Sequence, residues 1–227
     1  VLHRGLEPEI LELDHQHMVG MARMLSHLVD YRSGYTSTHT AGVAHTAAAL
    51  AELQGLPPER CREVLLAGYL HDLGKLAVPR EILDKPARLD RDEFGLMKAH
   101  AYFTRRILST VEGLEEIAVW ASSHHERLDG HGYPFHDRTL SVESRVLAVA
   151  DVFTAITEDR PYRAGMEHDE VERELTSMVA SGKLDPGIVD LEGVIKATPS
   201  MSFTPYPPTK HTLTLFMRGS GVQDVGQ

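Results

Sequence analysis

The sequence predicts an all-α protein of about seven to eight helices, followed by an irregular, proline-rich tail. Apolar residues recur with a period close to 3.6 over most of the chain, and capping residues and glycines separate the apolar segments. The apolar/polar alternation typical of a strand occurs convincingly only over residues 211–217. Four prolines between residues 199 and 208 precede that segment, so we expect residues 198–227 to form the tail.

The expected helix boundaries rest on local sequence signals. Pro57 and Pro58 suit the first turn of a helix, Asp90 and Glu93 form a capping box, and Ser141 is a favourable N-cap. Glycines follow several of the apolar segments, as expected at helix C-termini. The expected helices span about residues 7–30, 36–54, 57–74, 90–107, 114–124, 141–153 and 171–181, with a short helix after residue 186.

Composition and charge exclude several classes of function. The net charge is −10, from 23 Lys+Arg against 33 Asp+Glu, and no basic cluster is present, so we expect no binding to duplex nucleic acid. No apolar run approaches the roughly 18 to 20 residues that cross a bilayer, so we expect no membrane span. The single cysteine, Cys61, is typical of the reducing cytoplasm, where we expect the protein to act.

The length of 227 residues fits one large domain, or one domain with appendages. The chain begins with Val1 and has no secretion leader, so we expect a fragment of a longer protein. Residues 1–26 would form a linker helix that follows an upstream sensory or receiver domain, and residues 27–197 would form the catalytic domain. The apolar stripe of the linker helix also predicts a homodimer through this helix.

Histidine is the compositional anomaly, with fourteen residues in the chain. Histidine is the commonest metal ligand in proteins, so a metal site is expected. Five imidazoles and two carboxylates fall on or next to five successive expected helices, while other histidines, such as His45, are expected on helix faces. The seven candidates are His39, His71, Asp72, His100, His124, His125 and Asp151.

The spacing of these candidates favours a site with more than one ion. Neighbouring residues on a straight helix point about 100° apart, so the pairs His71–Asp72 and His124–His125 can converge only because each lies at a helix end. Mixed imidazole and carboxylate ligands suit iron, manganese, zinc or nickel better than calcium. Seven ligands exceed the needs of one ion, and two ions bridged by Asp72 would use them all.

Two motifs carry a resemblance to a known family. The segments HDLGK (residues 71–75) and HHERLDGHGYP (residues 124–134) resemble those of the HD-GYP subfamily of HD-domain metal-dependent phosphohydrolases. The segments EILDKPARL (residues 81–89) and ADVFTAITEDRPYR (residues 150–163) are similar to the same subfamily. The resemblance covers roughly residues 27–195, and the ordered set of motifs is far more specific than an HD dipeptide alone.

The resemblance implies an HD-domain helical bundle that hydrolyses cyclic di-GMP to pGpG, GMP or both, through a hydroxide activated by two divalent metal ions. Iron or manganese is the expected metal, with zinc or nickel as alternatives. The resemblance makes the seven candidates above the metal ligands, with Asp72 bridging. Lys75 becomes a phosphate contact and a candidate proton donor, and Tyr133, Arg160 and Arg163 become substrate contacts.

Two positions depart from the family pattern. Members with a third metal carry a glutamate where this chain has Tyr35, so two metals are expected here. Many members also have a second aspartate where this chain has Thr154, which puts an outer contact in doubt and leaves the ligand set intact. His131, within the GYP motif, occupies a variable position and is expected to face solvent.

Several alternatives stay open from the sequence. The substrate could be another cyclic dinucleotide, such as cyclic GMP-AMP, or the domain could bind the nucleotide as a sensor without hydrolysing it. Lys75 could serve only as a cation at a helix C-terminus. Arg160 and Arg163 could simply pair with nearby acidic side chains at the surface.

Overall fold

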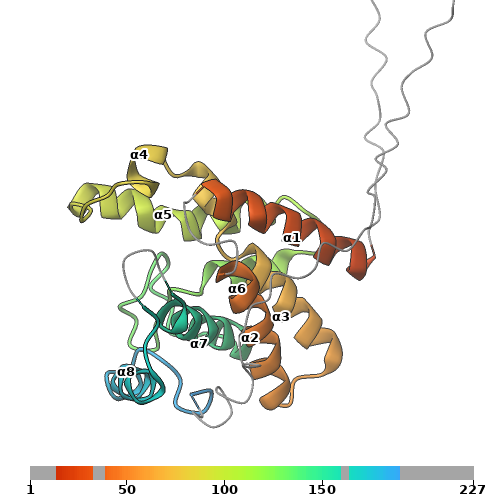
Figure 1. Ribbon diagram of the computed structural model, residues 1–227. Helices are drawn as coiled ribbons and strands as arrows, with labels where there is room; N and C mark the ends of the chain where they lie inside the picture. The colour runs from red at the N-terminus through yellow and green to blue at the C-terminus, as the bar shows by residue number, and fades with distance from the viewer. Residues whose placement is uncertain (1–13, 33–38, 160–163, 190–227) are drawn as a thin grey trace, which may run out of the picture.

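The computed structural model describes residues 14–32, 39–159 and 164–189, and these residues form an entirely helical domain (Figure 1). The predicted all-α fold is therefore confirmed. Within the described ranges the chain forms eight α-helices and one short 3-10 helix, η1. In chain order they are α1 (His15–Arg32), α2 (His39–Leu53), α3 (Pro58–Leu70), η1 (Leu73–Ala77), α4 (Arg80–Leu83), α5 (Arg91–Leu108), α6 (Glu115–Ser122), α7 (Val142–Thr157) and α8 (His168–Ala180).

The helix starts follow the capping chemistry of the sequence. At α5, the Asp90 carboxylate accepts hydrogen bonds from the backbone N–H groups of Asp92 and Glu93, and the Glu93 carboxylate accepts one from the backbone N–H of Asp90. These bonds satisfy N–H groups that lack partners within the helix. At α7, Oγ of Ser141 accepts a hydrogen bond from the backbone N–H of Ser144. The predicted capping box and N-cap are both confirmed.

The core lies where α2 packs against α3 and α7. Ala44, Ala47 and Ala51 of α2 are fully buried, and a Cβ placed on Gly68 of α3 would come within 2.5 Å of Cα of Ala44. The two helix backbones can therefore approach closely only because both surfaces are formed by small residues. This close packing brings the first described residue of α2 near the end of α3, which is followed directly by two of the candidate ligands, His71 and Asp72.

Helix α5 packs along η1, and α6 packs against both α5 and α7. In Figure 1, α1 and α5 cross one end of the molecule, while α7 and α8 lie at the other. Between these two groups of helices, the C-terminal ends of α3 and α6 come close to the middle of α5 and of α7. That meeting point positions the candidate site.

The structure differs from the predicted elements in two places. The third helix was expected to end near residue 74, but α3 ends at Leu70 and the chain continues as η1 and the short α4. Residues 186–188 form a turn where a short helix was expected. The strand-like segment and the tail lie outside the described residues, and the domain boundaries at residues 26 and 197 stay predictions. No helix among the described residues is both long and apolar enough to cross a membrane.

Candidate metal centre

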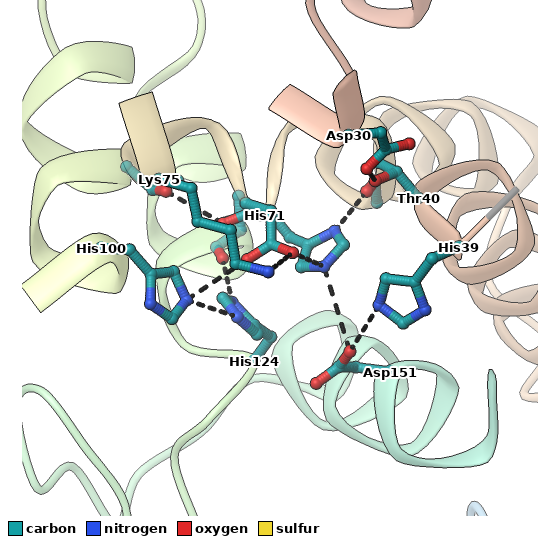
Figure 2. Close-up of polar contacts among 12 residues, drawn as sticks. Asp30, His39, Thr40, His71, Lys75, His100, His124 and Asp151 are labelled. Carbon is teal, nitrogen blue, oxygen red and sulfur yellow. Dashed lines mark hydrogen bonds and ion pairs between the residues drawn. The ribbon is translucent and has the colours of Figure 1, made fainter. Parts of the chain in front are cut away.

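Seven imidazole and carboxylate side chains from α2, α5, α7 and the ends of α3 and α6 converge on one buried centre (Figure 2). They fall into three overlapping groups, in each of which the ligand atoms lie within 4.8 Å of one another. Together the groups contain all seven ligands that the sequence predicted. The groups are His39–His71–Asp151, His71–Asp72–His124 and His100–His124–His125.

Three of the histidines are oriented in the same way. Nδ1 of His71, His100 and His124 lies 2.7 Å from the backbone carbonyl oxygen three residues earlier in each case. A carbonyl oxygen only accepts hydrogen bonds, so each Nδ1 donates and carries the ring proton. In the neutral form of each ring, Nε2 is therefore a bare lone pair, and all three Nε2 atoms point into the centre.

These lone pairs fit a cation. Nε2 of His100 and Nε2 of His124 face each other at 3.3 Å, although neither carries a proton in the tautomer that the carbonyl bonds select. Nε2 of His71 is buried and has no hydrogen-bond partner among the described residues. Buried nitrogens without partners are costly. Divalent ions of the iron, manganese, zinc or nickel type would satisfy them, because imidazole and carboxylate ligands suit these metals.

Asp72 lies between the two halves of the centre. Its Oδ2 is 3.2 Å from Nε2 of His71, and its Oδ1 is 3.3 Å from Nε2 of His100, so the two oxygens face opposite sides. The Lys75 ammonium lies 2.6 Å from Oδ2. Burial opposes ionisation of this carboxyl, but Lys75 and the His71 imidazole outweigh it and hold the pKa of Asp72 well below its usual value. Asp72 is therefore an anion at neutral pH.

The other half of the centre is built around Asp151 of α7. Its Oδ1 is 3.4 Å from Nε2 of His39, and its Oδ2 is 3.6 Å from Nδ1 of His125. Burial lowers the pKa of His125 to about 4, so this ring is neutral and able to act as a ligand at neutral pH. Burial would also lower the pKa of His39, but hydrogen bonds with Asp151 and Glu158 outweigh burial and raise it to about 9.

The turn between α3 and η1 is fixed from behind by α5. Oγ1 of Thr104 donates a hydrogen bond to the carbonyl oxygen of His71 and accepts one from the backbone N–H of Gly74. A side chain at Gly74 would collide with the backbone of α5. This contact sets the distance between the turn that carries Asp72 and the helix that carries His100.

The loop that carries Gly132, Tyr133 and Pro134, here the GYP loop, is ordered by the buried carboxylate of Glu126. Its Oε1 accepts hydrogen bonds from the backbone N–H groups of Phe135 (2.6 Å) and His136 (3.1 Å). A Cβ on Gly132 would lie 2.5 Å from the backbone nitrogen of Arg127, so only glycine lets the loop close this tightly. The loop thereby places the Tyr133 ring against the His125 ring, with 4.7 Å between their centroids.

A cavity of about 350 Å³ opens next to the centre, between the GYP loop, α7 and the end of α8. His125 and Asp151 form its inner edge, and Ile156 and Met178 contribute an apolar wall. Arg127 and Lys183 are the cationic residues among those that line it. A polar inner edge, an apolar wall and two cations are the features of a site for an anionic organic ligand.

The structure thus brings together all seven predicted ligands, with Lys75 and Tyr133 beside them, while their roles stay predictions. Arg160 and Arg163, and the departure at Tyr35, lie outside the described residues. Sequence reasoning did not single out Thr104, Arg127, Lys183 or Glu158 as functional residues. Only the position of Glu158, two helical turns after Asp151, gave a signal that could have been used.

The fold and the site define a helical protein with a buried centre for divalent metal ions. The chain matches the family model for the HD domain over residues 6–188. It therefore belongs to the HD-domain family, and the resemblance of its motifs to the HD-GYP subfamily is confirmed by its relatives.

Two characterised relatives act on cyclic dinucleotides. The chain is 37% identical over 178 residues to 3′3′-cGAMP-specific phosphodiesterase 1 of Vibrio cholerae. The aligned segment covers 78% of this chain and 41% of that protein. It is 41% identical over 157 residues to a cyclic di-GMP phosphodiesterase of Pseudomonas aeruginosa. This alignment covers 68% of this chain and 37% of that protein. The chain thus spans about two fifths of the length of these relatives.

A solved structure supports the fold assignment. The HD domain of the Listeria monocytogenes phosphodiesterase PgpH superposes with a TM-score of 0.53 at 13% sequence identity, covering 82% of this chain and 95% of that one. At this identity the likeness concerns the helical fold alone.

Proposed function

We propose that this domain hydrolyses a phosphodiester bond of a cyclic dinucleotide, with cyclic di-GMP as the first candidate. The observation that carries the proposal is the convergence of seven metal-ligand side chains, all buried except the partly exposed His125, beside a cavity of about 350 Å³ with cationic residues in its lining. The curated relatives, named as phosphodiesterases for cyclic di-GMP or 3′3′-cGAMP, support the substrate class.

The seven side chains would hold two divalent ions, with Asp72 between them because its two oxygens face opposite halves of the centre. Two divalent ions, when bound, supply Lewis-acid charge at a phosphate and lower the pKa of water. Hydrolysis adds water across one P–O3′ bond and leaves a 5′-phosphate and a 3′-hydroxyl. The proton for that hydroxyl can come from Lys75, whose ammonium lies 2.6 Å from Asp72 beside the reacting centre.

The cavity would hold one nucleotide half of the substrate. Its apolar wall suits a purine base, and Tyr133 presents a ring at the entrance to the metal ligands. A cyclic dinucleotide carries two phosphates, and only one of them can undergo reaction at the centre. Arg127 and Lys183, which line the cavity, would neutralise the other, in a protein whose net charge is −10.

The test is metal analysis of anaerobically purified protein, followed by product chromatography with cyclic di-GMP and, separately, cyclic GMP-AMP. We expect about two metal ions per chain, iron or manganese, and release of a linear dinucleotide or mononucleotide. Preferential turnover of cyclic GMP-AMP would change the substrate, and tight binding without product would favour the sensor alternative. A protein that retains no metal and binds neither nucleotide would contradict the proposal.

Replacement of Lys183 by methionine tests the role of the cavity. We expect the KM for the cyclic dinucleotide to rise about tenfold, because a hydrogen bond to a charged group contributes about 1.5 kcal/mol or more. Hydrolysis of bis(p-nitrophenyl) phosphate, which has no second phosphate, should be unchanged. Arg106→Met, at an exposed cation on α5, is the matched control. An equal loss on both substrates would contradict a contact with the second phosphate.

Three further expectations concern the whole protein and stay predictions: a homodimer through the N-terminal helix, an upstream sensory or receiver domain, and action in the cytoplasm. A tagged and an untagged copy of the chain, co-expressed and purified through the tag, test the first of them. Retention of the untagged copy is expected, and its loss when residues 1–26 are removed would locate the contact.

A further inference from the structure

His39 differs from the other helix-borne histidines in how its ring is held. His71, His100 and His124 each use a backbone carbonyl oxygen three residues earlier to fix Nδ1. His39 is the first residue of α2 that the structure describes. Its Nδ1 instead lies 3.2 Å from Oε2 of Glu158, a side chain from the far end of α7 (Figure 2 shows His39 beside α7).

Helix α7 therefore reaches both nitrogens of one imidazole. Asp151 and Glu158 are seven residues apart, which is two helical turns, and residues at this spacing lie on the same side of a helix. Oδ1 of Asp151 is 3.4 Å from Nε2 of His39, and Oε2 of Glu158 is 3.2 Å from Nδ1. The ring is held edge-on between the two carboxylates, at the contact of α2 with α7.

The position of Glu158 is unfavourable for helix stability. It follows directly after the last residue of α7, where the unpaired carbonyl groups carry partial negative charge and a cation would be preferred. Its side chain is also only 12% exposed. A partly buried carboxylate at a helix C-terminus is stabilised by interactions that compensate for its charge, and the N–H of the His39 imidazole is one of them.

We propose that Glu158 is the positioning residue for His39. It accepts the Nδ1 proton, so that a divalent ion can replace the proton on Nε2, which faces Asp151, and bind the lone pair of that nitrogen. Glu158 does for His39 what the backbone carbonyls do for His71, His100 and His124, and such outer carboxylates raise the basicity of a ligating imidazole. The inference rests on the proposed function only in requiring that the centre binds a divalent ion.

Binding of Mn²⁺, measured from the EPR signal of the free ion during titration of the metal-free protein, tests this role. We expect Glu158→Ala to weaken the Mn²⁺ site that includes His39 by about 10- to 100-fold. Glu158→Gln should restore most of the affinity, because the amide oxygen can still accept the Nδ1 proton. Asp159→Ala removes the adjacent carboxylate, which accepts a hydrogen bond from the backbone N–H of Gly165. This variant should bind Mn²⁺ as the wild type does.

The tautomer itself gives a second readout, which does not depend on any variant folding. In ¹⁵N-histidine-labelled, zinc-loaded wild-type protein, we expect His39 to carry its proton on Nδ1. A proton on Nε2, or unchanged Mn²⁺ affinity in folded Glu158→Ala, would overturn the inference. Wild-type protein that binds Mn²⁺ but leaves cyclic dinucleotides intact would contradict the proposed function alone. Wild-type protein that binds no Mn²⁺ would overturn both.

Discussion

Asp72→Asn is expected to remove metal binding and activity together. The substitution preserves the size of the side chain but removes the anion that faces both His71 and His100. Its amide N–H₂ group could also donate a hydrogen bond to one of the bare Nε2 lone pairs, in the place that a metal ion would take. If the ions contribute at least about 4 kcal/mol to the transition state, turnover should fall about 1000-fold or more.

Metal content per chain and turnover of the cyclic dinucleotide should be measured on the same purified sample of Asp72→Asn. Asp169→Asn is the matched control, because this carboxylate is 95% exposed on α8 and lies outside the centre. A folded Asp72→Asn protein that holds the same number of ions as the wild type would contradict the bridging role. Lost turnover with metal content unchanged would instead assign Asp72 to a later step, through its contact with Lys75.

The helical fold could be predicted from the sequence because its signals are local. The capping box at Asp90 and the N-cap at Ser141 act within a few residues, and the structure has both. The segment after residue 71 was less predictable, because η1 and α4 are short and depend on their packing against α5. A four-residue helix has too few residues to show a period.

The candidate ligands could be selected from the sequence only in part by physical reasoning. His39 and His45 both lie near the start of α2, and periodicity alone does not separate them. The structure does: Nε2 of His45 lies 3.1 Å from the Tyr69 hydroxyl group, whereas His39 faces Asp151. The motif resemblance made the same choice, because it carries the positions of residues that are distant in the sequence.

Residues that act through packing could not be predicted in this way. Glu158 appears in the sequence as one acid among several, and its role depends on which face of α7 meets α2. Thr104 is an ordinary polar residue until α5 is placed against the turn that follows α3. Gly74 is part of the HDLGK motif, but the sequence does not show why a glycine is needed there.

The structure gives a steric reason for Gly74 and with it a prediction of large effect. A Cβ at this position would lie far inside van der Waals contact with the carbonyl oxygen of His100 and 2.5 Å from the backbone nitrogen of Thr104. Both are backbone atoms of α5 and cannot move aside as a flexible side chain could. Gly74→Ala should therefore lower the free energy of unfolding by about 3 kcal/mol or more, as measured by urea denaturation.

Gly95→Ala on α5, the helix against which Gly74 packs, is the control, and its expected effect has the opposite sign. A Cβ there has no atom within 4 Å, and alanine in an open helix position is more favourable than glycine by about 0.8–1.0 kcal/mol. Gly74→Ala should also separate the Asp72 turn from His100, so any folded fraction should bind Mn²⁺ more weakly than the wild type. Wild-type stability and Mn²⁺ affinity in Gly74→Ala would mean that α5 can move away without disturbing the centre, and the steric argument would then be wrong.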